Sequence, residues 1–303
     1  MAPRKQIPYT ITNFESIRTE GYLYVDKTRF IEMLENEGTK YQFLIRPRKF
    51  GKTLFTSVLN HYYDIRFKDK FQELFGDLYI GQHPTPLRNS YFVMNFNFSG
   101  LDTSDVECFK RSFTMATKMS IMHFLTEHQT VIEDCQKKEI EVWELNDVRN
   151  CLEYAFRIIK SYNRKAYVII DEYDHFANDV IAKGAEISKN QYRESVWANS
   201  VTKDFYETLK IGTTTVVDKI FVTGITPIML DDLTSGFNIS NNLSLEKRYN
   251  EILGLTREEI EWVMEQIQLD RSLISIDIEK MYNGYLFHKK AENKLFNSTM
   301  IFY

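Results

Sequence analysis

The sequence predicts an α/β fold, a three-layer sandwich in which helices cover both faces of a mostly parallel central sheet. Strand-like apolar segments alternate with helix-like segments along the 303 residues, which is the order that parallel sheets with crossover helices produce. Residues 166–170 (Ala-Tyr-Val-Ile-Ile) form a continuous apolar run, which is typical of a strand buried on both faces. No repeat and no linker rich in Pro, Gly or Ser interrupts this order.

The apolar patterns also give approximate element bounds. Strands are predicted at residues 41–45, 91–98, 166–170 and 219–224. Helices are predicted at residues 30–34, 52–63, 105–128, 144–162 and 188–211. Near the end, Thr256 followed by Glu259 forms a capping-box pattern ahead of a last apolar helix. We therefore expect a domain of residues 1–235 and a mainly helical extension of residues 236–303.

Composition narrows the class of protein. A net charge of −4 gives no general basic field for nucleic acid, although a local basic patch stays compatible with it. The three cysteines, Cys108, Cys135 and Cys151, form no CxxC pair, which argues against a disulfide framework and a zinc cluster. The N-terminus has no apolar signal region, and no run has the length of a membrane span. We expect a cytoplasmic protein with no membrane partner.

A phosphate-binding loop is predicted where the strand at 41–45 gives way to a helix. Gly51, Lys52 and Thr53 stand at this junction, where backbone N–H groups of a loop and a helix N-terminus can cradle phosphate oxygens. The Lys52 ammonium would reach the β- and γ-phosphates, and the Thr53 hydroxyl would hold Mg²⁺. No late Asn/Thr-Lys-x-Asp guanine reader is present, so ATP with Mg²⁺ is the expected ligand.

The start of this loop departs from the usual pattern. Arg46 stands where a glycine normally opens the loop, and Pro47, Arg48, Lys49 and Phe50 follow it. The loop is therefore stiffer and more cationic than usual, and arginine does not readily adopt the positive φ that glycine supplies. We expect residues 46–53 to bind the nucleotide, with Arg48 and Lys49 adding charge near the phosphates. The alternative is a basic surface turn.

Two carboxylates directly follow the buried strand at 166–170. Packing explains a carboxylate at such a strand end poorly, whereas ligands of parallel sheets bind at this edge. Asp171 is expected to orient Mg²⁺, and Glu172 to polarise the attacking water as general base. Asp174 is a third carboxylate, which either assists the metal or caps the next helix.

Together these motifs resemble the bacterial family of predicted AAA-ATPase-like proteins. The resemblance covers nearly the whole chain and rests on five segments in family order. They are residues 24–28 (Tyr-Val-Asp-Lys-Thr), 46–53 (Arg-Pro-Arg-Lys-Phe-Gly-Lys-Thr), 169–174 (Ile-Ile-Asp-Glu-Tyr-Asp), 222–227 (Val-Thr-Gly-Ile-Thr-Pro) and 282–285 (Tyr-Asn-Gly-Tyr). The resemblance implies a P-loop NTPase fold with an additional strand, residues 91–98, between the two Walker strands. It also makes the missing first glycine a family trait.

The resemblance further implies roles for single residues. Thr223 matches a polar sensor at a strand end, with Thr226 second, although a threonine there would equally satisfy a neighbouring carbonyl. Asp26 and Lys27 would lie near the base or ribose; the alternative is a helix-start turn with Thr28 as the N-cap.

Arg248 is a further candidate, as an arginine finger in cis or from a neighbouring subunit. The alternative is a solvated helix start. Members of the family usually continue into a domain resembling the PD-(D/E)xK nucleases, which we expect to be absent or truncated here. By family analogy alone, the expected partners are further copies of the chain and a nucleic acid or another protein.

The expected function is Mg²⁺-dependent ATP hydrolysis by a switch or motor domain, linked to nucleic-acid processing or defence. Two alternatives stay open. One is a nucleotide-gated interaction module with little turnover, and the other is a P-loop kinase in which the carboxylate activates a substrate hydroxyl.

Overall fold

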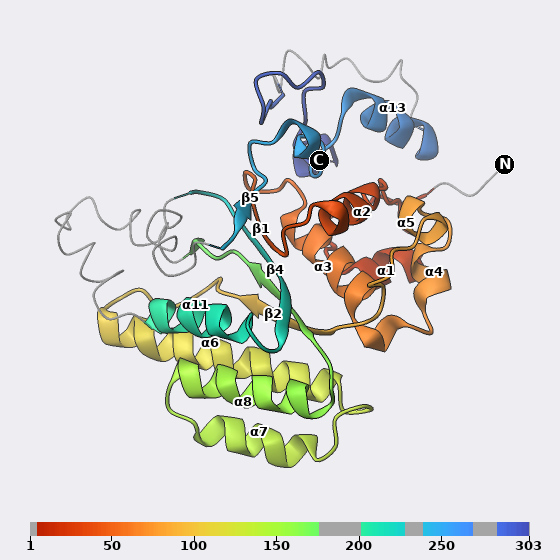
Figure 1. The fold of residues 1–303 in the computed structure, drawn as a ribbon. Helices are drawn as coiled ribbons and strands as arrows, with labels where there is room; N and C mark the ends of the chain where they lie inside the picture. Colours follow the sequence, from red (N-terminus) through yellow and green to blue (C-terminus); the bar gives the residue numbers. More distant parts are fainter. Residues whose placement is uncertain (1–4, 176–200, 228–238, 269–283, 303) are drawn as a thin grey trace.

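A parallel five-stranded sheet forms the centre of the protein (Figure 1). The computed structural model describes residues 5–175, 201–227, 239–268 and 284–302. The strands are β1 (Tyr41–Ile45), β2 (Phe92–Asn97), β3 (Ala166–Asp171), β4 (Val217–Gly224) and β5 (Asn241–Asn242). Their order across the sheet is β2-β3-β4-β1-β5, with parallel pairing throughout. The predicted α/β class with a mostly parallel sheet is confirmed.

The strand order differs from the expected topology in one detail: the strand predicted at residues 91–98 does not lie between the two Walker strands, β1 and β3. Along the chain β2 lies between β1 and β3, but in the sheet β4 separates these two strands, and β2 is the outer neighbour of β3. Burial explains this order. Seven of the eight residues of β4 are buried, as a central strand requires, whereas β2 ends in an exposed–buried–exposed pattern that suits an edge.

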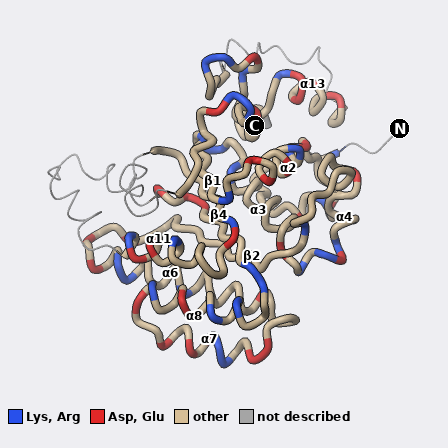
Figure 2. Tube along the Cα trace, in the orientation of Figure 1, with Lys and Arg blue, Asp and Glu red and all other residues tan. Residues whose placement is uncertain are grey.

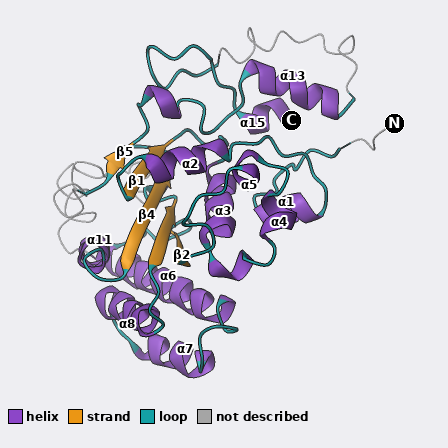
Figure 3. Ribbon diagram, turned by 45° about the vertical axis from the view of Figure 1, so that its right-hand side comes forward, coloured by secondary structure: helices purple, strands orange, loops and turns teal. Residues whose placement is uncertain are grey.

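The two faces of the sheet are covered by different helices, because successive strand residues point to opposite faces. On one face, Val168 and Ile170 pack with α6 (Val106–Glu127), α8 (Val148–Ser161) and α11 (Val201–Gly212). On the other face, Tyr167 and Ile169 belong to a second apolar cluster. Its helices are α1 (Phe14–Thr19), α2 (Arg29–Asn36), α3 (Lys52–Tyr63), α4 (Phe71–Phe75) and α5 (Tyr79–Gln82). The result is the predicted three-layer sandwich (Figure 3).

Most of the predicted bounds hold within one or two residues. Strand 41–45 and helix 52–63 are matched residue by residue, and the helix predicted at 105–128 is α6. Of the helix predicted at 188–211, only α11 lies within the described residues. Helix α7 (Cys135–Glu144) was not predicted, because it packs outside α6 and buries only Val142, so its sequence has no apolar stripe.

The C-terminal segments continue from the sheet. Strand β5 pairs with β1, and Leu243 and Tyr249 are buried in the same cluster as α2 and α3. The remaining elements are the 3₁₀ helices η1 (Ile65–Phe67) and η2 (Lys247–Tyr249) and the helices α13 (Arg257–Gln266) and α15 (Ser298–Phe302). The capping box predicted at the start of α13 is present. A domain boundary at residue 235 stays a prediction.

Charge is spread over all of these layers. Lys and Arg are interspersed with Asp and Glu along the described chain, as Figure 2 shows. Within the described ranges, no helix is long and apolar enough to cross a membrane.

Candidate functional site

The phosphate loop occupies the turn between β1 and α3. Gly51 is the N-cap of α3 and has φ of 92°, a left-handed conformation in which a side chain would be strained. Lys49 is also left-handed, with φ of 66°. The loop therefore winds tightly before the helix, and the free N–H groups of the first turn of α3 point out of the carboxyl edge of the sheet.

Lys52 contacts the phosphate loop itself, and Thr53 contacts the carboxylate at the end of β3. The Lys52 ammonium donates to the carbonyls of Arg46 and Pro47 at 3.1 and 3.0 Å, so it folds back over its own loop. Burial lowers the pKa of Lys52, and the nearby Asp171 and Glu172 oppose this effect. The Thr53 hydroxyl donates to the Asp171 carboxylate at 2.8 Å.

The carboxylates stand at the end of β3. Asp171 is buried, and burial raises its pKa; the hydrogen bond from Thr53 acts against this and the charge of Glu172 adds to it. Glu172 leaves the strand direction with φ of 51°, its N–H donates to Asp171 Oδ1 at 3.0 Å, and it lines the cavity described below. The left-handed conformation of Glu172 thus separates the two neighbouring carboxylates: Asp171 accepts from Thr53, and Glu172 lines the cavity.

Asp174 joins the ends of two neighbouring strands, and the helix that it was expected to cap lies outside the described residues. Asp174 is fully buried and accepts from the N–H groups of Ile225 and Thr226 and from the Thr226 hydroxyl, at 2.6–3.1 Å. It therefore ties the exit of β3 to the exit of β4. Thr226, the second candidate for the sensor, is one of its partners.

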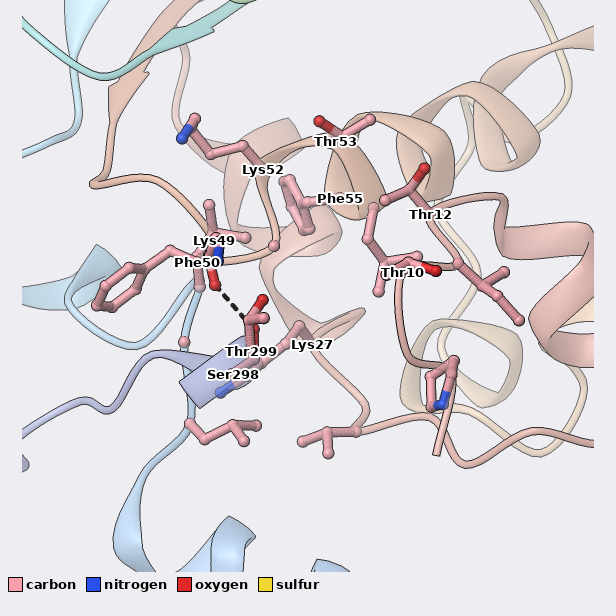
Figure 4. A pocket seen from close by; sticks show the side chains of 18 of the residues that line it. Thr10, Thr12, Lys27, Lys49, Phe50, Lys52, Thr53, Phe55, Ser298 and Thr299 are labelled. Atoms are coloured by element: carbon pink, nitrogen blue, oxygen red, sulfur yellow. Dashed lines mark hydrogen bonds between the residues drawn. The ribbon is translucent and has the colours of Figure 1, made fainter. Parts of the chain in front are cut away.

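A cavity of about 430 Å³ opens beside the loop (Figure 4). Its walls come from residues 8–12, 23–25, 27, 48–55, 172, 253–255 and 298–299. In Figure 4, Thr10 and Thr12 lie across the cavity from Lys49, and the Lys49 carbonyl accepts from the Ser298 hydroxyl at 3.1 Å. The segments 8–12, 253–255 and 298–299 were not predicted, because no local pattern in them marks a ligand and only the fold brings them to the loop.

Arg46 differs from its predicted role. Its side chain is fully buried and does not line the cavity; it donates to the carbonyls of Ile45, Ser244 and Tyr249. A guanidinium in this position needs such acceptors, since an unpaired buried charge is costly. The Arg46 carbonyl, like that of Pro47, accepts a hydrogen bond from the Lys52 ammonium.

Two residues proposed for catalysis lie away from the cavity. The buried Thr223 hydroxyl donates to the carbonyl of Leu44 at 2.8 Å, which is the alternative role that its sequence position allowed. Arg248 is half-exposed in η2 and pairs with Glu246 and Glu37. Neither residue is among the described residues that line the cavity.

Asp26 and Lys27 have separate environments. Asp26 accepts from the N–H and hydroxyl of Thr28 and from the N–H of Tyr79, so its carboxylate braces the start of α2. Lys27 lines the cavity, and its ammonium lies 2.6 and 2.7 Å from the two carboxylate oxygens of Glu259. Burial lowers the pKa of Lys27, and Glu259 opposes that effect.

The donor set fits a magnesium–nucleotide complex. Magnesium in phosphate sites takes one or two protein oxygens and completes its shell with phosphate oxygens and water. The adjacent Thr53 hydroxyl and Asp171 carboxylate supply such a pair. In the part of the chain that the structure describes, no cluster of three or more His, Cys, Asp or Glu forms a metal site made by the protein alone.

Comparison with known proteins assigns the chain to a family. The profile of the family described as "Predicted AAA-ATPase" matches residues 8–234. A relative described as "Uncharacterized protein in vnfD 5'region", from Azotobacter chroococcum mcd 1, is 26% identical over 317 residues, covering 99% of this chain and 52% of the relative. The chain thus spans about half the length of that protein.

Among solved structures, a Walker-type ATPase of Pyrococcus abyssi matches with a TM-score of 0.40 and 12% identity, over 89% of this chain and 63% of the other. The family profile covers most of the chain, including the phosphate loop and the two carboxylates that end β3. The chain therefore belongs to the predicted AAA-ATPase family.

Proposed function

We propose that this chain binds ATP with Mg²⁺ at the phosphate loop and hydrolyses it, acting as a switch or motor domain. The observation that carries the proposal is the 2.8 Å hydrogen bond between the Thr53 hydroxyl and Asp171. It joins the first turn of α3 to the end of β3, two elements that are 118 residues apart in sequence. These are the oxygens that would hold Mg²⁺ between the loop and the strand.

Lys52 and the loop N–H groups would bind the phosphates. The Lys52 ammonium now donates to two neutral carbonyls, and anionic phosphate oxygens make stronger, charge-assisted hydrogen bonds. The N-terminus of α3, a helix of 12 residues, adds a favourable dipole for an anion. Mg²⁺, when bound, would neutralise charge on the phosphate oxygens.

Glu172 is the proposed general base. It is the carboxylate that lines the cavity, whereas Asp171 is hydrogen-bonded to Thr53 behind it. A carboxylate there can accept the proton of a water that attacks the γ-phosphate. General-base catalysis of this kind contributes roughly 10²–10⁴-fold to a rate, so loss of Glu172 should reduce turnover by about that factor.

The test measures ATP binding and phosphate release by the whole chain with Mg²⁺, with and without DNA. Lys52→Ala should lose ATP binding, and Glu172→Gln should keep ATP binding but lose turnover. Lys110→Ala and Glu107→Gln are matched controls, because these residues form an exposed pair on α6 outside the cavity. Equal ATP affinity of the parent and Lys52→Ala would refute the phosphate-loop assignment. Stimulation by DNA would support a nucleic-acid partner.

A second candidate is a nucleotide-gated interaction module with little turnover. The observation in its favour is that Thr223 and Arg248, both expected to assist hydrolysis, are engaged by Leu44 and by two glutamates outside the cavity. Such a module would bind ATP through Lys52, and Glu172→Gln would leave its phosphate release unchanged. If Arg248 instead completes the site of a neighbouring copy, turnover per chain should rise with protein concentration, and Arg248→Ala should abolish that rise.

A further inference from the structure

Phe50 connects the phosphate loop to the C-terminal part of the chain. Its ring is buried and meets the rings of Tyr285 and Phe287 edge-on, with centroids 5.0 and 5.6 Å away. Its carbonyl accepts from the N–H of Gly254 at 3.1 Å. In Figure 4 the Phe50 ring points away from Thr53, so this side chain serves packing behind the loop.

Arg46 makes a second connection to the same part of the chain. Its guanidinium lies 3.9 Å from the centre of the Phe287 ring, a cation–π contact, and donates to the carbonyls of Ser244 and Tyr249 at 2.9 and 2.7 Å. Because Lys52 donates to the Arg46 carbonyl, the residue that Phe287 holds is also an anchor of the phosphate-binding lysine.

The main chain between Arg46 and Phe50 is held in the same way. The Arg48 carbonyl accepts from Asn297 Nδ2 at 2.9 Å, and the Lys49 carbonyl accepts from the Ser298 hydroxyl at 3.1 Å. The Asn297 side chain also accepts from the N–H of Thr299 at 3.0 Å, which fixes its orientation at the start of α15. Asn297 is therefore held at one end by α15 and donates to the loop at the other.

These contacts hold the left-handed Lys49 of the phosphate loop in place. The left-handed Lys49 is strained unless neighbouring structure fixes it, and its carbonyl and that of Arg48 are fixed by Ser298 and Asn297. Residues 284–298, here called the C-terminal brace, are tied together by the two hydrogen bonds between Tyr285 and Leu295, at 2.8 and 2.9 Å. Tyr285 is the last residue of the 282–285 sequence motif, and it is not among the described residues that line the cavity.

We propose that Phe287 and Asn297 are positioning residues for the phosphate loop, and that docking of the C-terminal brace and binding of ATP are thermodynamically linked. The proposal rests on the proposed function in taking ATP as the ligand. Linkage is reciprocal: if the docked brace raises the affinity of the loop for ATP, ATP strengthens the docking of the brace by the same factor. Whatever pulls the brace away then weakens ATP binding.

Two conservative substitutions test the positions. Phe287→Leu keeps an apolar side chain but removes the aromatic face under Arg46. Asn297→Ser keeps a capping oxygen for α15, but its shorter side chain lacks the Nδ2 amide that donates to the Arg48 carbonyl. We expect each to raise the Kd for ATP by about 5-fold or more, the lower end of typical coupling between linked sites. Phe287→Tyr, which keeps the ring, should retain the parent Kd. Phe109→Leu, in the cluster on the opposite face of the sheet, is the control for loss of a ring.

Hydrogen exchange of the parent protein supplies a readout that does not depend on the variants folding. ATP should slow exchange in residues 284–298, and this protection should be absent in Lys52→Ala. If the parent binds ATP but exchange in the brace is unchanged, or if both brace variants bind ATP as the parent does, the linkage is refuted while the ATP site stands. If the parent binds no ATP at all, the proposed function fails first.

Discussion

Replacing Gly254 by alanine should destabilise the protein and weaken ATP binding, because the added methyl group would meet the phosphate loop from behind. Gly254 is left-handed, with φ of 79°, and its N–H donates to the Phe50 carbonyl. A Cβ at this position would lie 2.8 and 2.9 Å from two carbons of the Phe50 ring and 3.1 Å from the Phe296 carbonyl. Real Cβ atoms hardly ever come within 3.0 Å of other atoms, so Phe50 would have to move.

Two separate terms lower the free energy of unfolding of Gly254→Ala. An L-residue in the left-handed region costs about 1–2 kcal/mol, partly offset by about 0.4–1 kcal/mol from the stiffer unfolded chain. Overpacking against a filled core typically costs about 1–3 kcal/mol more. Gly38 has φ of 76°, and a Cβ there would meet nothing within 4 Å, so Gly38→Ala carries only the first cost. The difference between the two variants, about 1–3 kcal/mol, measures the contacts of the added methyl group with Phe50 and the Phe296 carbonyl.

Calorimetry and ATP titration of both variants make the assay. At about 2–4 °C per kcal/mol for a chain of this size, Gly254→Ala should melt several degrees below Gly38→Ala. Only Gly254→Ala should raise the Kd for ATP, because only there does Phe50, and with it the loop, move. Equal melting temperatures and equal ATP affinities for the two variants would show that Phe50 yields without disturbing the loop, and the reasoning would be refuted.

Two buried carboxylates give predictions of opposite sign in pH. Burial raises the pKa of Asp171 above that of the unfolded chain, so ionising this carboxyl costs more free energy in the folded state. The free energy of unfolding therefore falls as pH rises from the ordinary carboxyl pKa through the raised folded-state pKa. Asp171→Asn should therefore raise the melting temperature at neutral pH, by about 2–4 °C for each kcal/mol relieved, and abolish Mg²⁺-dependent phosphate release; a melting temperature at or below the parent's at neutral pH would contradict this. Burial also acts to raise the pKa of Asp64, but hydrogen bonds with His128 and Arg66, each at 3.1 Å, outweigh it and lower the pKa. Asp64 therefore contributes stability above the ordinary carboxyl pKa that is lost as pH falls through its lowered pKa, and Asp64→Asn should cost about 3–5 kcal/mol in neutral urea unfolding and progressively less in acid. A loss that does not vary with pH would assign the effect to packing.

The sequence was most informative where one local pattern decides the structure. The run at 166–170 is apolar at every position, so only a strand buried on both faces fits it, and the carboxylates after it had to lie at the sheet edge. Gly51 preceding Lys52 marked the turn into α3, because a left-handed residue is required there. The pairing of Thr53 with Asp171 followed from these two placements.

What the sequence did not reveal depends on contacts between distant segments. Arg46 looked like a phosphate ligand, yet it is drawn inward by the carbonyls of Ser244 and Tyr249, 198 and 203 positions later in the chain. Thr223 looked like a sensor, and its hydroxyl is taken by the neighbouring strand at Leu44. The wall at residues 8–12 carries no motif of its own. No periodicity or spacing encodes which remote carbonyl or cavity a side chain will meet.

The division of the sheet into two apolar clusters separates the chemistry from half of the molecule. Among the described residues, those that line the cavity come from the loop, from Glu172 and from segments at the two ends of the chain, and none comes from α6, α7, α8 or α11. Within the described residues, a substitution in those four helices can therefore reach the cavity only through the packing of the sheet between them. The outer surface of α7 is accordingly a place for a fluorophore or an affinity handle that does not touch the described walls of the cavity.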